Sequence, residues 1–93
     1  MSQGGATRTV QIVNKRGLHA RASAKFVKTA SGFEAEVRVS KDGQTVDARS
    51  IMGLMMLAAG PGSAIEIEAE GPDAEAAVTA LDALVSAKFD EDE

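Results

Sequence analysis

The chain has 93 residues, a formal net charge of −4 and only three aromatic residues, so aliphatic side chains have to build its single modest core. It contains no cysteine, which excludes disulfides and fits a reducing compartment. The acidic balance, with no aromatic residues interleaved among the basic ones, argues against nucleic-acid binding.

The first third of the chain predicts a strand followed by a helix. Residues 1–6 are rich in glycine, and we expect this N-terminus to be flexible. Residues 7–13 alternate well enough for a strand that turns Val10 and Ile12 toward the core. After a loop at residues 14–17, apolar side chains follow one another at helical spacing. This stripe consists of Ala22, Phe26, Val27 and Ala30.

The middle of the chain predicts a hairpin and a short helix. Asp42-Gly43 lies between the alternating stretches 36–40 and 44–48, as in a type I′ turn, where both central residues need a positive φ. Ser50 then precedes the longest apolar stretch, 51–59, and serine is a good N-cap. This stretch is too short to cross a membrane. We assign Leu54 and Leu57 to the core, and Ile51, Met52 and Met55 to another face of the same helix.

The last third predicts a strand, a helix and a tail. Residues 64–69 alternate, and Asp73 can cap the helix that follows them. That helix carries a regular apolar stripe made of Ala74, Ala77, Val78, Leu81, Leu84 and Val85. The acidic tail 90–93 is expected to be a frayed, solvated end, so that residues 1–93 form one domain with an ordered core at about 7–89.

The order of these elements is β-α-β-β-α-β-α. It predicts an α+β fold of two layers, with helices on one face of a mainly antiparallel sheet. The first fifteen residues lack the apolar run of a secretory signal. We therefore expect a cytoplasmic protein without membrane insertion, and a monomer by default.

The sequence Gly17-Leu18-His19-Ala20-Arg21 holds the only histidine and lies between the first strand and the first helix. Free N–H groups and the dipole at a helix N-terminus favour an anion. A nucleophilic imidazole beside a guanidinium there could accept a phosphoryl group. A lone histidine at such a junction is more often a polar surface residue. A metal site would need carboxylates alone to complete its shell, and a general base would lack a second catalytic group.

The basic residues are unevenly distributed along the chain. Six of the ten lie in the first third, namely Arg8, Lys15, Arg16, Arg21, Lys25 and Lys28. Their closeness to His19 in the sequence suits a surface that meets phosphate or an acidic protein partner.

Two motifs together identify a family. The chain resembles HPr, the histidine-containing phosphocarrier protein of the bacterial phosphoenolpyruvate-dependent phosphotransferase system, from about residue 7 to residue 88. One motif is the sequence around His19, and the other is Ser50-Ile51-Met52-Gly53-Leu54-Met55, seven residues after the Asp42-Gly43 turn. The resemblance implies an open-faced β-sandwich, with three helices on one side of four antiparallel strands.

The resemblance also implies a function. His19 would take a phosphoryl group from phosphorylated enzyme I on its δ1 nitrogen and pass it to an enzyme II A-type domain, with Arg21 helping to neutralise the phosphate. Such a chain carries phosphoryl groups for sugar transport and is not an enzyme. It needs no cofactor or metal. The alternative is a regulatory relative in a nitrogen-related branch, which controls partner proteins through its phosphorylation state.

Two further roles follow from the resemblance alone. Ser50 is expected to be phosphorylated from ATP by an HPr kinase/phosphorylase, which is compatible with a plain N-cap role. Ile51, Met52 and Met55, which could instead be ordinary core, would form an apolar docking patch with Arg21 and Lys28 as charged contacts. The sequence departs from the family at Ala22, where proline is usual.

Overall fold

The computed structural model describes residues 5–91 and contains the seven expected elements in the expected order. A short 3₁₀ turn at Lys88–Asp90 follows them. The elements are β1 (Gly5–Gln11), α1 (Ala20–Ala30), β2 (Glu36–Lys41), β3 (Gln44–Asp47), α2 (Ile51–Met56), β4 (Ala64–Glu70) and α3 (Ala74–Ser86).

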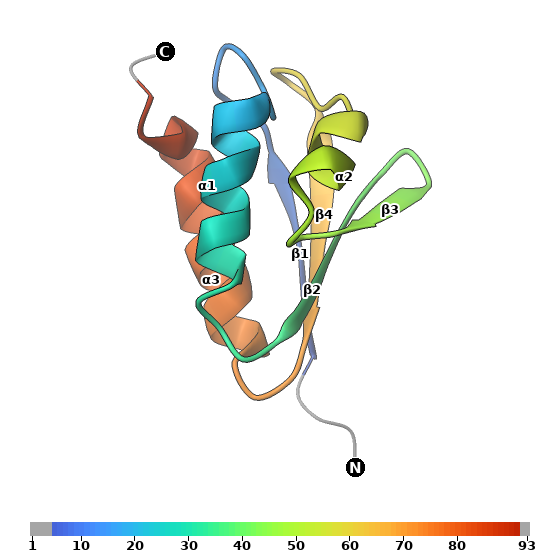
Figure 1. Cartoon of the computed structure of the whole chain (residues 1–93), viewed down its shortest axis with the longest axis vertical. Coiled ribbons are helices and arrows are strands. Elements are labelled where there is room, and N and C mark those ends of the chain that lie inside the picture. Colours follow the sequence, from blue (N-terminus) through green and yellow to red (C-terminus); the bar gives the residue numbers. More distant parts are fainter. Residues whose placement is uncertain (1–4, 92–93) are drawn as a thin grey trace.

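The four strands form one antiparallel sheet in the order β1-β4-β2-β3, and the three helices cover one of its faces (Figure 1). This confirms the α+β open-faced sandwich. Asp42 and Gly43 join β2 to β3 with φ angles of 51° and 82°, as a type I′ turn requires. The other face of the sheet carries exposed polar residues such as Thr9, Glu66 and Glu68.

The core lies between the sheet and the helices. Along β4 the side chains alternate strictly, with Ile65 and Ile67 buried and Glu66 and Glu68 exposed. Each fully buried side chain of this size contributes about 1.5–3 kcal/mol relative to an exposed one. The largest fully buried apolar side chains are Phe26, Phe89, Ile12, Leu54, Ile65, Ile67 and Leu81.

Two details differ from the sequence-based expectations. Strand β1 begins and ends two residues earlier than predicted, although Val10 and Ile12 are buried as expected. Asp73 stands at the N-cap of α3 but makes no side-chain capping bond. Its carboxylate instead accepts a hydrogen bond from the backbone N–H of Glu34 at 2.7 Å, because the turn before α3 packs against the loop after α1. Among residues 5–91, no helix is long and apolar enough to cross a membrane.

Candidate functional site

His19 is the N-cap residue of α1 and has an extended backbone, with φ −73° and ψ −179°. Its Nδ1 accepts a hydrogen bond from the backbone N–H of Arg21 at 3.2 Å, so the imidazole satisfies one of the free donors of the helix end. The His19 side chain is only 16% exposed. The interpretation of His19 as a plain surface residue therefore does not fit the structure.

The loop before His19 is fixed by close backbone packing. Gly17 has a φ of 65°, and a Cβ at this position would collide with the carbonyl oxygen of Ala59 and approach Cα of Gly60 to 2.9 Å. Leu18 donates its N–H to the Ala59 carbonyl at 2.9 Å. The motif glycine is thus needed for contact with the segment that follows α2, and this contact sets the position of His19.

The second ring nitrogen of His19 is paired with the end of the chain. Nε2 lies 2.6 Å from a carboxylate oxygen of Glu91, 72 positions away in the sequence. The buried amide of Asn14 donates one hydrogen bond to the other Glu91 oxygen at 3.1 Å and one to the Gly17 carbonyl at 2.9 Å. Sequence reasoning missed both Glu91 and Asn14, and it treated Glu91 as part of a solvated tail.

Residues 88–91 form a C-terminal hook, which follows α3 and lies near the start of α1 (Figure 1). The hook brings Glu91 to His19. Lys88, Phe89 and Asp90 have φ angles of 58°, 55° and 62°, a left-handed conformation that costs roughly 1–2 kcal/mol per residue outside glycine. The Phe89 ring is fully buried, and its carbonyl accepts a hydrogen bond from Lys25 Nζ at 2.7 Å. Burial of a large side chain and a charged hydrogen bond offset the strained turn.

The hydrogen bonds of Glu91 control its ionisation. Burial by itself raises the pKa of Glu91, but the hydrogen bonds from His19 and Asn14, together with the charges of His19 and Lys25, lower that pKa below its ordinary value. The group is therefore a carboxylate at neutral pH. A carboxylate is an acceptor only, so it accepts from both Asn14 and Nε2 of His19.

The two hydrogen bonds of the imidazole assign its proton. Nδ1 faces a backbone N–H, so Nδ1 holds a lone pair in the neutral ring. The ring proton then lies on Nε2, which points at the Glu91 carboxylate. This tautomer presents Nδ1 as a nucleophile at the positive end of a helix.

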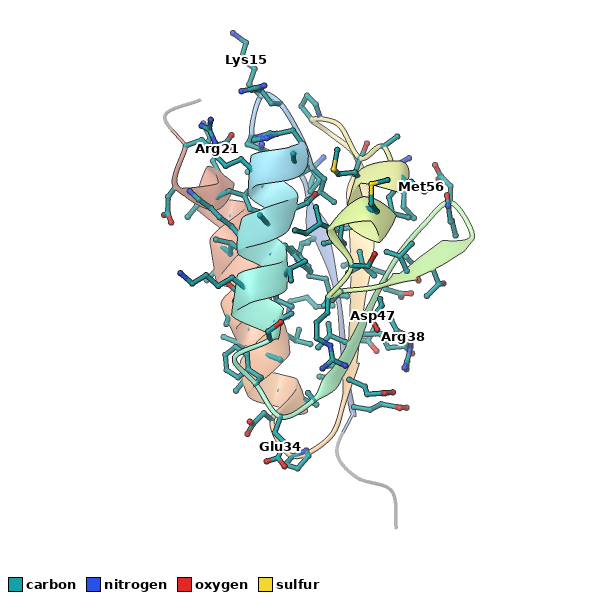
Figure 2. The ribbon with its side chains drawn as sticks, in the orientation of Figure 1. Lys15, Arg21, Glu34, Arg38, Asp47 and Met56 are labelled. Atoms are coloured by element: carbon teal, nitrogen blue, oxygen red, sulfur yellow. The ribbon has the colours of Figure 1, made fainter. Side chains whose placement is uncertain are left out.

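Basic side chains gather at this end of the molecule, though fewer than the sequence suggested. Lys15, Arg16 and Arg21 are exposed, and Figure 2 shows Lys15 and Arg21 at the end opposite Glu34. Arg8 instead pairs with Asp82 at 2.9 Å. Lys28 is exposed in the last turn of α1, about 13 Å along the helix axis from His19.

Helix α2 supplies the apolar neighbourhood of His19. Ile51, Met52 and Met55 are 40%, 69% and 39% exposed, while Leu54 and Leu57 are buried as expected. Met56 is 66% exposed and was not singled out from the sequence (Figure 2). A shallow hollow of about 280 Å³ joins this helix to the histidine, and it is lined by Arg16, Leu18, His19, Met55, Ala58, Ala59 and Gly60.

Ser50 caps α2 as expected, and Gly53 donates its N–H to the serine Oγ at 2.9 Å. A Cβ at Gly53 would lie 3.0 Å from that oxygen, so the glycine leaves the hydroxyl room. No group of three or more potential metal ligands occurs among the residues that the structure describes.

Fold and site together define the class of this protein: it is a phosphocarrier that bears its phosphoryl group on histidine, and not an enzyme with turnover of its own. A family model described as the phosphorylation site of the HPr component of the phosphotransferase system matches residues 6–87. The chain belongs to the HPr family of phosphocarrier proteins.

Individual relatives agree with this assignment. The phosphocarrier protein HPr of Cupriavidus necator is 52% identical over 86 residues, which are 92% of this chain and 97% of the relative. The crystal structure of HPr from Thermoanaerobacter tengcongensis, 45% identical, superposes with a TM-score of 0.90 over 95% of this chain and 99% of the other. The phosphocarrier protein NPr of Shewanella violacea is 48% identical over 90% of this chain and 92% of its own length.

Proposed function

We propose that Nδ1 of His19 accepts a phosphoryl group from phosphorylated enzyme I and passes it to an A-type domain of enzyme II. The protein would act as a monomer in the cytoplasm. The observation that supports this most directly is the hydrogen bond from the Arg21 N–H to Nδ1, because it keeps a lone pair on that nitrogen at a helix N-terminus.

The chemistry is an exchange of one bond to phosphorus for another. The Nδ1 lone pair forms the N–P bond while the bond from phosphorus to the donor breaks and leaves its electron pair on the donor. The backbone N–H groups of the first turn of α1 then face the phosphate oxygens, and the exposed Arg21 guanidinium adds a positive charge. A helix end contributes about 0.3–1 kcal/mol to an exposed anion, which is weak enough for onward transfer.

The test is intact mass spectrometry after incubation with phosphoenolpyruvate and enzyme I. We expect one acid-labile phosphoryl group on the wild type and none on His19→Asn. Asparagine is the matched variant because its side-chain oxygen preserves the N-cap of α1 while the imidazole is lost. A phosphoryl group on His19→Asn, or none on the wild type, would contradict the proposal.

The apolar patch is defined here as Ile51, Met52, Met55 and Met56, and we assign to it the docking of both partners. Its four side chains are exposed, and Met55 lines the same hollow as His19. Methionine adapts its shape to different surfaces, which suits a carrier that meets a donor and an acceptor in turn. Arg21 and Lys28, seven residues apart and on one face of α1, would supply charged contacts at the rim.

Ser50 is proposed as a site of regulatory phosphorylation by an HPr kinase/phosphorylase. Its side chain is partly exposed at the start of α2, directly beside the apolar patch. A phosphate there would add a charge of about −1.5 to −2 next to the docking surface. That charge would repel an acidic partner that the basic residues around His19 attract.

A second candidate function is regulation in a nitrogen-related phosphotransferase branch, and the 48% identity to an NPr protein favours it specifically. His19 would carry the phosphoryl group in either branch. The two candidate functions can be distinguished by letting the enzyme I proteins of the two branches compete for this chain. The enzyme I of the branch in which the chain works should phosphorylate it with the higher kcat/KM.

A further inference from the structure

We infer that Glu91 is a positioning residue for His19, which keeps the ring proton on Nε2 through the whole cycle of phosphoryl transfer. The inference rests on the proposed acceptor role of His19 and assigns a task to a residue outside both family motifs. It starts from the 2.6 Å contact between Nε2 and a Glu91 carboxylate oxygen.

Only a carboxylate satisfies the groups that surround Glu91. One of its oxygens faces the Asn14 amide N–H and the other faces Nε2 of His19, so both oxygens must accept. The Asn14 amide is held in this orientation because it also donates to the Gly17 carbonyl. A glutamine at position 91 would turn its own amide donors toward one of these two donors.

The C-terminal hook fixes the position of the Glu91 carboxylate. Phe89 is buried, and Lys25 donates a hydrogen bond to the Phe89 carbonyl. The left-handed turn at Lys88–Asp90 then brings Glu91 to Nε2 of His19. Glu91 is only 15% exposed in its side chain, similar to the 16% of His19. The carboxylate that faces Nε2 is therefore largely shielded from water.

The proton balance of the transfer gives this carboxylate a task. When the Nδ1 lone pair forms the N–P bond, the proton on Nε2 stays and the ring gains one positive charge. Glu91 faces that charge at Nε2, so no proton has to leave. In the onward step the N–P bond breaks, its electron pair returns to Nδ1, and the neutral ring with its proton on Nε2 is regenerated. Because Nε2 keeps its proton, the ring leaves as neutral imidazole, which is a better leaving group than the imidazolate anion.

The experiment is ¹H–¹⁵N NMR of the His19 ring, on unphosphorylated protein at neutral pH, in the wild type and in Glu91→Ala and Asp90→Asn. Asp90→Asn is the matched control because it removes one negative charge from an exposed neighbour in the same hook. We expect an Nε2–H cross-peak in the wild type and the control. In Glu91→Ala the Nε2 proton should exchange with water at least tenfold faster and the cross-peak should disappear.

A wild type without the cross-peak, or an equally protected proton in Glu91→Ala, would overturn the inference. Phosphoryl transfer from enzyme I is the second readout. We expect Glu91→Ala to accept the group roughly tenfold more slowly, the loss associated with one hydrogen bond to a charged group, while Asp90→Asn keeps the wild-type rate. Unchanged transfer in Glu91→Ala would overturn the role in the cycle. The ring NMR is recorded on unphosphorylated protein and needs no phosphoryl donor, so it tests the role of Glu91 by itself. If His19 is not the acceptor, the transfer experiment shows this separately, because the wild type then receives no phosphoryl group.

Discussion

At the scale of single residues, His19 combines two roles that are usually separate. Its imidazole caps α1 through Nδ1, and the same nitrogen is the proposed nucleophile. The apolar stripe placed His19 and Arg21 at a helix end, where a phosphoryl acceptor is chemically reasonable, and the resemblance to HPr then gave both residues their predicted roles. Nothing in the sequence pointed to Glu91, since a contact across 72 positions leaves no local pattern and an acidic tail resembles many solvated ends.

Gly17 offers a test of how the histidine loop is positioned. We expect Gly17→Ala to lower the free energy of unfolding by at least about 3 kcal/mol, because strain at a positive φ adds to a collision with the Ala59 carbonyl. The matched control is Gly43→Ala, which has the same kind of φ and open space around it, and should lose only about 1–2 kcal/mol. Urea unfolding measures both values. Equal losses would show that the contact with Ala59 does not fix the loop.

At the scale of elements, the sequence predicted the three α-helices and the four strands of residues 5–91, because each has a clear apolar period and a turn or cap at its boundary. The hairpin was the sharpest case, since Asp42-Gly43 suits only a turn with two positive φ angles. The sequence did not predict the 3₁₀ turn at Lys88–Asp90. The prediction for Asp73 was wrong in one respect: the capping preference of aspartate was overridden by a tertiary hydrogen bond to the loop at Glu34.

Helix α2 allows the capping role of Ser50 to be separated from its proposed regulatory role. We expect Ser50→Ala to destabilise the protein by about 1 kcal/mol, because the bond from the Gly53 N–H is lost, whereas Ser50→Asp keeps a capping oxygen and stays near wild-type stability. Neither variant should be labelled by an HPr kinase/phosphorylase with ATP, unlike the wild type. If Ser50→Ala is as stable as the wild type, the capping role of Ser50 is wrong. If Ser50→Ala is still labelled by the kinase, Ser50 is not the phosphorylation site.

At the scale of the whole molecule, the surfaces are divided by charge and polarity. The net charge of the chain is −4, yet the end that bears His19 combines basic residues with the apolar patch. Exposed glutamates cover much of the open sheet face. Under the proposed docking role of this end, such a separation would restrict partner recognition to the end that bears His19. The sequence indicated the division through the uneven distribution of its basic residues, but it placed too many of them at the site. Arg8 is paired with Asp82, and Lys25 is engaged with the hook.

The apolar patch gives a direct test of docking. We expect Met52→Asp to slow phosphoryl transfer from enzyme I at least tenfold, since a charge would be buried in the proposed interface. Stability should stay within about 0.5 kcal/mol, because the side chain is 69% exposed. Ala76→Asp is the matched control: it adds the same charge at an exposed position near the start of α3, at the other end of the molecule. Transfer rates that match between the two variants would rule out the patch.

The family and its fold were predictable from the sequence, whereas the closure of the site by the chain end was not. The fold follows from patterns that repeat within each element, but the hook depends on the burial of Phe89 and on three left-handed residues that are not glycine. Side chains of this type rarely adopt such a conformation, so no propensity points to it. Only the packed structure brings Glu91 to the histidine.

The central claim is that the phosphoryl group is carried on Nδ1 of His19. Its most direct test is a ¹H–³¹P correlation by NMR on the protein phosphorylated by enzyme I and phosphoenolpyruvate, with ¹⁵N in the imidazole ring. We predict a single phosphorus bonded to Nδ1, with Nε2 still protonated beside Glu91. Phosphorus on Nε2, or on a residue other than His19, would contradict the account.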